Sequence, residues 1–439
     1  MSVKAVMLAC TLGLIACDDD GAPSTTTDVG PDVGKGDRAD EEIPANWSAR
    51  IDAMWLHLDL GEMTGKATIW FEPGDAKRVS LEAAGLRIDA VYGDDGALKW
   101  DKRDGAVHIA HDVDDGPLHI DYGFGHVEES QGYSEKGSTV LWPYFCGNVF
   151  PCHSGPDDGI TFELSVSGYD EGLSAIYPGE VFAEAPSYML AFALGRYTCE
   201  TLGATRAGTT VDVCWLPRGK TAALEGTRTL VKAFDWLEKN LGRYTFGDRV
   251  ASVAVDWGKS GAGGMEHHPF WHIAKSEMGD PVTHVHEAVH GWFGNGVRIA
   301  CWEDFVLSEG TTSYLTARAL GAVTGKATER AIWESYREEL LLALEDEDIV
   351  AWPETCGAVD LLSDGLFSNI VYMKGAFFWR AVAEAIGAEW LDRVLASFYK
   401  ARVGTAASMG DVLQALHDDT GFDPEPLADK WLRSPGNPF

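Results

Sequence analysis

The stretch His284-Val-His286-Glu287-Ala-Val-His290-Gly-Trp-Phe-Gly-Asn295 decides how this chain folds. On an α-helix with about 3.6 residues per turn, positions 286 and 290 fall on one face, so two imidazoles can converge on one metal ion. Glu287 lies beside them and can reach a water held by that metal, which suits a general base. The same spacing also arises by chance, so this interpretation needs support from the rest of the chain.

A third metal ligand is expected at Glu309. Residues 291–295 should end the first helix, and Asp304 and Ser308 offer helix-start chemistry for a second one. The second helix can bring the carboxylate of Glu309 back onto the first helix. Two histidines and one glutamate leave the fourth tetrahedral position to water, which is the pattern of a catalytic zinc site and not of a closed structural one.

Two further blocks flank this stretch. Upstream, Gly263-Gly264-Met265-Glu266-His267 follows an apolar run at 250–256 that is typical of a strand. Downstream, Val371-Tyr372-Met373-Lys374-Gly375-Ala376 opens a strongly apolar helix. With the histidine motif between them, these blocks resemble the signature blocks of the gluzincin aminopeptidases, the family of aminopeptidase N and leukotriene hydrolase.

The resemblance implies a role for each residue of the motif. The ligands of the family's single Zn²⁺ ion correspond to His286, His290 and Glu309. Glu287 corresponds to the base that activates the zinc-bound water, and Tyr372 to the phenol that stabilises the oxyanion. Glu266 corresponds to the carboxylate that binds the free α-amino group of a substrate. His284 and His272 are expected to be buried or rim residues, because three ligands and a water complete a tetrahedral zinc site.

The predicted substrate-binding block consists of Gly263, Gly264, Met265, Glu266 and His267. Its glycines would let a substrate backbone lie close to an edge strand. His267 stands where the family usually has Asn. Many relatives also supply a Glu or Gln several residues before a Phe-Pro-Cys segment. Here Phe150-Pro151-Cys152 is present, but the preceding Leu141-Trp142-Pro143-Tyr144-Phe145 includes no such side chain. Recognition of the amino terminus is therefore expected to depend on Glu266 alone.

The resemblance implies a zinc aminopeptidase that releases amino-terminal residues from peptides outside the cytoplasm. Two alternatives stay open: a thermolysin-like zinc endopeptidase, which would not need Glu266, and a non-catalytic peptide-binding lipoprotein. We expect a monomer. Larger relatives continue into a helical-repeat domain, which is expected to be missing from this short form.

Composition excludes other classes of function. The chain has 439 residues, of which 45% are hydrophobic and 23% charged, so it can bury two or three globular cores. Its formal net charge of -33 disfavours binding to nucleic acid or to an anionic membrane surface.

The first 17 residues resemble a bacterial lipoprotein signal peptide. Lys4 precedes an apolar run that is too short to span a bilayer, and Leu14-Ile15-Ala16-Cys17 resembles a lipobox. Cys17 is then expected to carry the lipid that tethers the protein to a membrane, on its periplasmic or cell-surface side. An ordinary signal peptide cut nearby is the alternative. Residues 18–45, rich in Gly, Pro, Ser, Thr and Asp, are expected to be a flexible linker.

The remaining chain predicts a multidomain α+β protein. From 46 to 195, short alternating runs separated by turns predict an antiparallel β-sandwich, as at 51–60, 67–71, 107–111 and 118–122. From 196 to 439 we expect a mainly helical, thermolysin-like zinc peptidase domain. Its expected helices include 224–241, 327–345, 367–386, 388–401, 408–417 and 425–433. Lys374 is expected on a helix surface.

Cysteine usage agrees with an exported protein. Apart from Cys10 in the signal segment and Cys17, six cysteines remain, an even number. We predict Cys146–Cys152 as a tight loop, Cys199–Cys214 across a hairpin, and Cys301–Cys356 as the remaining pair.

Overall fold

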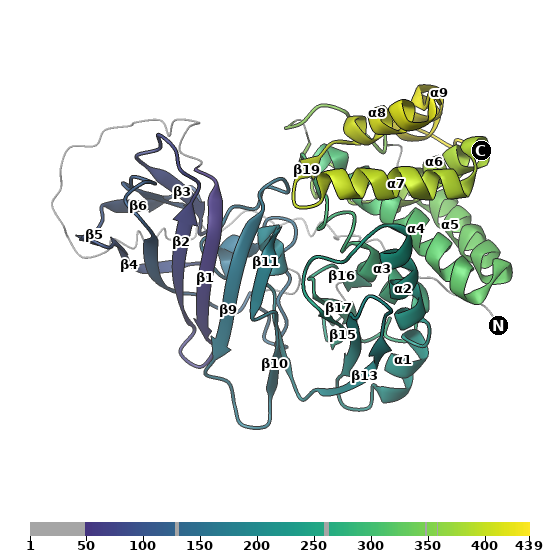
Figure 1. Cartoon of the computed structure of the whole chain (residues 1–439). Helices are drawn as coiled ribbons and strands as arrows, with labels where there is room; N and C mark the ends of the chain where they lie inside the picture. Colours follow the sequence, from purple (N-terminus) through teal and green to yellow (C-terminus); the bar gives the residue numbers. More distant parts are fainter. Residues whose placement is uncertain (1–48, 128–130, 259–262, 347–348, 358) are drawn as a thin grey trace.

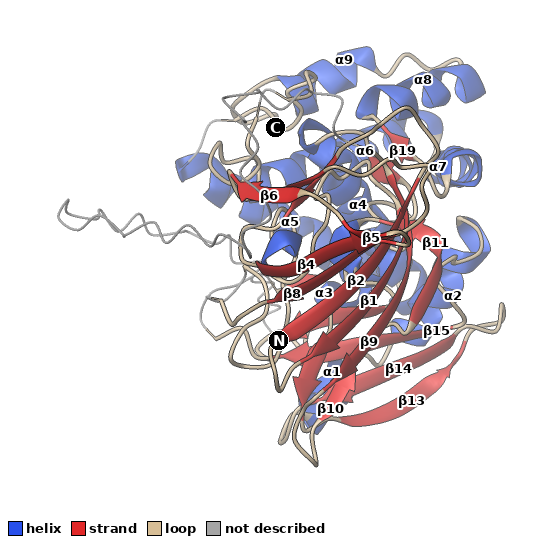
Figure 2. Ribbon diagram, turned by 90° about the vertical axis from the view of Figure 1, so that its left-hand side faces the viewer, coloured by secondary structure: helices blue, strands red, loops and turns tan. Residues whose placement is uncertain are grey.

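The computed structural model describes residues 49–127, 131–258, 263–346, 349–357 and 359–439. The predicted signal peptide, Cys17 and the linker lie outside these residues. Within the described residues the chain forms a β-rich N-terminal half and a mainly helical C-terminal half, which lie side by side (Figures 1 and 2).

The N-terminal half is built on a seven-stranded sheet of order β11-β9-β1-β2-β8-β4-β5. Its strands are β1 (Ile51–Asp59), β2 (Thr64–Phe71), β4 (Arg87–Gly93), β5 (Gly96–Ala97), β8 (Leu118–Gly123), β9 (Ile160–Ser167) and β11 (Glu180–Ala185). A three-stranded sheet follows the order β3-β7-β6, with β3 at Val79–Glu82, β6 at Trp100–Arg103 and β7 at Ala106–Ile109. Strands β10 (Ser174–Ile176) and β12 (Ala193–Gly195) pair with each other.

Alternation of apolar and polar residues explains these strands. In β1, Met54, Leu56 and Leu58 are buried, whereas the intervening Trp55 and His57 are exposed. The predicted β-domain is confirmed with one difference, since β9 pairs with β1 in parallel. A long connection, and not a hairpin, leads from β8 back to β9, which allows the parallel pairing.

The C-terminal half begins with a five-stranded sheet of order β13-β14-β15-β17-β16. Its strands are β13 (Thr198–Ala204), β14 (Thr210–Trp215), β15 (Arg249–Val255), β16 (Gly264–Met265) and β17 (Phe270–Ala274). The predicted boundary at residues 195 and 196 falls between β12 and β13. The short β16 forms one edge of the sheet and runs antiparallel to β17, so the substrate-binding block predicted from the sequence begins on an edge strand.

Helices make up most of this half, as predicted. They are α1 (Lys220–Gly226), α2 (Leu230–Asn240), α3 (Pro281–Val289), α4 (Phe305–Thr324), α5 (Lys326–Asp346), α6 (Asn369–Ile386), α7 (Ala388–Arg402), α8 (Met409–Thr420) and α9 (Glu425–Ala428). A five-residue π-helix at Asp429–Arg433 follows α9, and β18 (Arg298–Ile299) pairs with β19 (Ala406–Ala407). No helix in the described part of the chain is long and apolar enough to cross a membrane.

Three local predictions in this half were wrong. The single helix expected at 224–241 is split into α1 and α2, and Gly226 at the end of α1 lies close against the Met278 carbonyl. Asp304 precedes α4, but its carboxylate accepts from the Met409 backbone N–H instead of capping that helix. Lys374 is buried and not on the surface, and its ammonium donates to the Ser434 carbonyl.

The three predicted disulfides are confirmed. Cys146 pairs with Cys152, Cys199 with Cys214 across β13 and β14, and Cys301 with Cys356. The last pair joins the residues just before α4 to the segment that precedes α6.

Candidate active site

The two histidines of the motif lie on α3, which has a clear start and end. Asp280 caps the helix by accepting from the backbone N–H groups of Val282 and Thr283, and Pro281 occupies the first helical position. The helix ends at Val289 with His290 as its C-cap, directly before the segment 291–295 that was predicted to stop it. His286 and His290 therefore share one face, and their rings lie 4.9 Å apart between centroids.

Helix α4 brings Glu309 against α3. It packs closely on α6 because two glycines face each other: a Cβ on Gly310 would lie only 2.6 Å from the Cα of Gly375. This close approach holds Glu309 on α4 and Tyr372 on α6 at the same cavity. Helix α4 thus carries the third metal-ligand side chain, Glu309, that the sequence predicted.

The three donor atoms form a nearly equilateral triangle. His286 Nε2 lies 3.2 Å from His290 Nε2, and Glu309 Oε2 lies 3.1 Å and 3.3 Å from these two nitrogens. Tetrahedral Zn²⁺ with bonds of about 2.0–2.1 Å separates its ligand atoms by about 3.3 Å. The residues present therefore fit one Zn²⁺ ion, and they leave its fourth position open to the cavity.

The imidazole of His290 is oriented for this role. Its Nδ1–H donates to the Phe293 carbonyl at 3.0 Å, which leaves the lone pair of Nε2 for a metal. His286 Nδ1 has no hydrogen-bond partner among the described residues.

Buried charge makes the cavity favourable for cations. Burial opposes ionisation of both Glu309 and His290, but their mutual attraction outweighs it, so the pKa of Glu309 is lowered and that of His290 is raised. Burial raises the pKa of Glu287 well above its usual range and that of Glu266 to about 7. Carboxylates this close together resist ionisation unless a cation is added between them.

Glu266 and Glu287 face the same cavity as the metal triad. Donor atoms of Glu266, Glu287 and His290 all lie within 4.8 Å of one another. Glu287 packs directly on β16, where a Cβ on Gly264 would lie 2.4 Å from its Oε1. Only a glycine fits there, and this explains one of the two glycines in the predicted block.

His267 is the one predicted site residue that does not line this cavity. Gly263, Gly264, Met265 and Glu266 do line it. His267 is buried behind them, with its Nδ1 3.0 Å from the Nδ1 of His272. It therefore lies inside the domain, against His272 of β17, and not where a substrate would contact it. His272 and His284 are buried away from the triad, as expected.

Sequence reasoning missed residues that support the site from behind. Asn295 donates from its side chain to the Glu266 carbonyl at 2.7 Å and accepts from the Tyr188 hydroxyl at 2.7 Å. His268 is hydrogen-bonded to the Glu287 carbonyl at 2.7 Å. No sequence pattern pointed to these roles, since they depend on contacts between distant segments.

The segment that contains most of this site is similar to a known protein family. Residues 274–431 match the model described as the Peptidase family M1 domain. This part of the chain is similar to peptidase family M1. Leucine aminopeptidase 2 of Aspergillus niger is 26% identical over 329 residues, which cover 66% of this chain and 51% of that protein. Glutamyl aminopeptidase of Sus scrofa is 21% identical over 432 residues, which cover 90% of this chain and 45% of that protein.

Solved M1 structures share the fold. The M1 zinc metallopeptidase from Deinococcus radiodurans superposes with a TM-score of 0.72 at 18% identity, covering 87% of this chain and 94% of that chain. Leukotriene A4 hydrolase from Saccharomyces cerevisiae gives a TM-score of 0.73 at 19% identity, covering 89% and 68%. The chain spans about half the length of the curated relatives that it matches.

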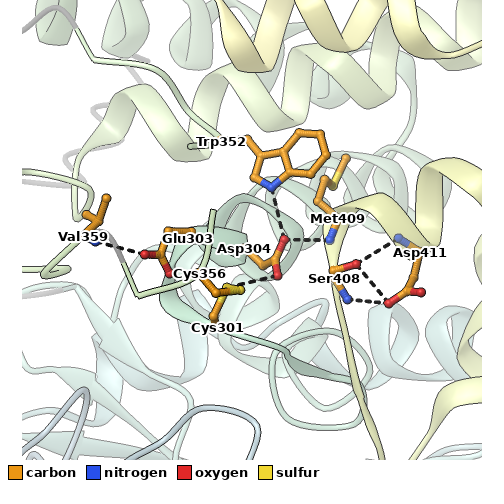
Figure 3. The surroundings of a disulfide bond; sticks show 9 residues. All are labelled: Cys301, Glu303, Asp304, Trp352, Cys356, Val359, Ser408, Met409 and Asp411. Carbon is orange, nitrogen blue, oxygen red and sulfur yellow. Dashed lines mark hydrogen bonds between the residues drawn. A yellow bond between two sulfur atoms is a disulfide. The ribbon is translucent and has the colours of Figure 1, made fainter. Parts of the chain in front are cut away.

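A cross-linked segment completes the cavity of this M1 domain. Figure 3 shows the Cys301–Cys356 disulfide, beside which Glu303 accepts from the Val359 backbone N–H at 2.9 Å and Asp304 from the Trp352 indole at 3.2 Å. The same segment continues to Phe367, Ser368 and Asn369, which line the cavity next to Tyr372. The start of α4 and one wall of the cavity are thereby tied together.

Proposed function

We propose that this protein is a zinc-dependent aminopeptidase that releases amino-terminal residues from peptides. The observation that carries the proposal is the presence of Glu266 and Glu287 at one cavity with the His286, His290 and Glu309 triad. An endopeptidase needs the triad and a base, but it has no need of a further buried carboxylate. Similarity to the M1 family supports the same function, because the curated relatives are named as aminopeptidases.

Each residue has a physical role in the proposed reaction. A bound Zn²⁺ ion would supply Lewis acidity toward the scissile carbonyl and toward water. Glu287 accepts a proton from the attacking water and passes it to the leaving amine. The Tyr372 phenol donates a hydrogen bond to the developing oxyanion, a contribution that is typically worth about 3 kcal/mol.

Glu266 holds the substrate's α-ammonium group in this proposal. The edge strand β16 leads into Glu266, so a peptide backbone can align beside it while its amino terminus meets the carboxylate. A solved mutant of the M1 enzyme from Deinococcus radiodurans carries a Tyr-Ser-Ala substrate, which supports a short free-ended peptide as the substrate here.

Replacing Glu266 tests this assignment. We expect Glu266→Gln to raise KM for peptides with free amino termini by at least tenfold, because an amide cannot pair with the ammonium charge. A thermolysin-like endopeptidase would show the same KM for free and acetylated peptides in both proteins, and that result would contradict the proposal.

We also propose that the protein is exported and tethered by a lipid on Cys17. The lipobox-like Leu14–Cys17 sequence supports this proposal, and so do three disulfides, which are typical of oxidising compartments. Growth with a radiolabelled fatty acid tests it: the wild-type protein should incorporate label and Cys17→Ala should not. Label in both proteins, or in neither, would contradict the tether.

A further inference from the structure

One wall of the cavity is aromatic. Trp142, from the N-terminal half, and Phe367, from the segment before α6, line the cavity on the side of Tyr372. Their rings are 4.9 Å apart between centroids. The acidic and imidazole groups of the triad, Glu287 and Glu266 also line the cavity, and the Tyr372 ring stacks on that of His286 at 6.0 Å between centroids. The cavity thus has both a charged and an apolar lining.

Packing fixes the aromatic wall in place. Behind it, Phe305 at the start of α4 lies 5.7 Å from the Trp142 ring and 5.6 Å from the Tyr372 ring. Trp302 contacts Trp142 edge-on at 5.9 Å. Trp142 is only 6% exposed. Because three separate segments supply these rings, the wall presents one shape and not a set of rotamers.

The terminal residue of a bound peptide has to lie inside this cavity. Its Cα carries both the ammonium group, which Glu266 holds, and the scissile carbonyl, which faces the triad. Its side chain therefore starts within the cavity, whereas later residues leave it along β16. The free wall that remains for that side chain is the aromatic one.

The balance of charge in the cavity disfavours a charged side chain on the amino-terminal residue of the substrate. Zn²⁺ and the substrate ammonium together balance the three carboxylates of Glu266, Glu287 and Glu309. No Lys or Arg is present among the described residues that line the cavity, so an acidic side chain would find no partner. A basic side chain would lose its hydration with no carboxylate left to pair with it.

We propose that Trp142 and Phe367 form the site for the side chain of the substrate's amino-terminal residue and select large apolar side chains, aromatic ones above all. This inference rests on the proposed function, since it takes Glu266 as the ammonium site. Burial of a Phe side chain against such a wall, with the ring contacts, corresponds to a preference over Ala of about tenfold to a hundredfold.

A series of peptides that differ only in the first residue tests the proposal. We expect kcat/KM to fall from Phe and Leu to Ala, Lys and Glu. In Trp142→Ala and in Phe367→Ala, the ratio of kcat/KM for Phe and Ala peptides should drop at least fivefold. Trp142→Phe should keep most of the ratio. Trp390→Ala removes an exposed indole on α7 and should leave the ratio at the wild-type value.

Several outcomes would overturn the inference. A wild-type preference for Ala, Lys or Glu, a preference that follows the second residue, or an unchanged ratio in both variants would each contradict it. Bound zinc and a cooperative melting transition in each variant show that a lost ratio does not reflect unfolding. If zinc-loaded wild-type protein released no terminal residue at all, the proposed function would fail as well; release with another preference would overturn this inference alone.

Discussion

Glu287 on α3 lines the cavity beside His286 without belonging to the ligand triangle. We expect Glu287→Gln to lower kcat by about 10²–10⁴-fold, because the amide cannot accept a proton, while one zinc per chain is retained. Peptide hydrolysis and metal analysis on the same sample check this. Glu389→Gln, at an exposed site on α7, serves as the control. Loss of zinc in Glu287→Gln would instead make Glu287 a ligand.

A second prediction concerns pH and the His153–Asp158 pair in the N-terminal half. Burial alone would lower the pKa of His153, but its contact with Asp158 at 3.0 Å and a bond to the Ser80 carbonyl raise it. Burial would likewise raise the pKa of Asp158, yet the pairing with His153 lowers it. Both shifts favour the charged forms of the pair in the folded protein.

The sign of the effect follows from the two shifts. The contribution of His153 is complete below its unfolded pKa of about 6.5 and is lost as pH rises through its higher folded value. That of Asp158 is complete above about 3.9 and is lost at lower pH. We expect His153→Gln to cost about 2 kcal/mol of unfolding free energy at pH 6 and less at pH 9, measured by urea denaturation. An equal loss of unfolding free energy at pH 6 and at pH 9 would contradict the pairing of His153 with Asp158.

Among individual residues, the sequence predicted only those that belong to a recognisable local motif. His286, His290, Glu309 and Glu266 could be named because fixed spacings join them to recognisable blocks. Asn295 supports Glu266 only through a fold that brings distant segments together. The position of Lys374 was predicted wrongly because its hydrogen-bond partner, the Ser434 carbonyl, lies far along the chain, and no local pattern indicated this acceptor.

At the scale of elements, the Cys301–Cys356 disulfide connects the start of α4 to a wall of the cavity. Its cysteines are 55 residues apart, so loss of the cross-link should cost about 4 kcal/mol of unfolding free energy. We expect the double variant Cys301→Ser/Cys356→Ser to melt at lower temperature and also to show a higher KM, because the segment that carries Phe367 is released.

The Cys199–Cys214 disulfide provides the matched control. It joins β13 and β14 across 15 residues, and no cavity residue lies between its cysteines. Its removal should cost about 3 kcal/mol with no change in KM. An equal change of KM in both variants, or in neither, would show that the disulfide does not hold the cavity wall.

Elements were predictable where one face of a strand or helix is apolar. The periodic patterns of α5, α6 and α7 extended over nearly their observed lengths. The split between α1 and α2 was not predictable, because it involves a close approach of Gly226 to the Met278 carbonyl on another segment. The strand β16 is too short to show any alternation.

For the whole molecule, Arg298 joins the two halves. This buried residue of β18 donates to the Asp157 carbonyl and to the Glu184 carboxylate of the N-terminal half, and to the Gly404 carbonyl of its own half. We expect Arg298→Met to lower the unfolding free energy by about 3 kcal/mol, near the low end for a broken buried ion pair because Glu184 is half exposed.

Chemical denaturation, followed by separate probes of the two halves, measures this effect. Arg228→Met is the control, since it breaks only an exposed pair with Glu225 and should cost less than about 1 kcal/mol. Equal stability of Arg298→Met and the wild type would show that Arg298 does not hold the halves together.

The order of a β-rich half and a helical half was predictable, since both follow from periodicity and motif order along the chain. The contact between the halves was not. Trp142 lies in the N-terminal half but lines the cavity of the catalytic half, and nothing in the residues around it indicates that position. The chemical groups of the site could thus be predicted from the sequence, whereas the shape of its apolar wall could be seen only in the structure.

One measurement tests the central claim most directly. The purified protein, with its zinc content determined, is incubated with two peptides of identical sequence, one with a free and one with an acetylated amino terminus, and the products are followed by mass spectrometry. We expect one bound zinc per chain and stepwise loss of single residues from the free peptide only, abolished by a chelator and restored by Zn²⁺. Internal cuts in the acetylated peptide, or zinc-loaded protein that cleaves neither peptide, would contradict the account.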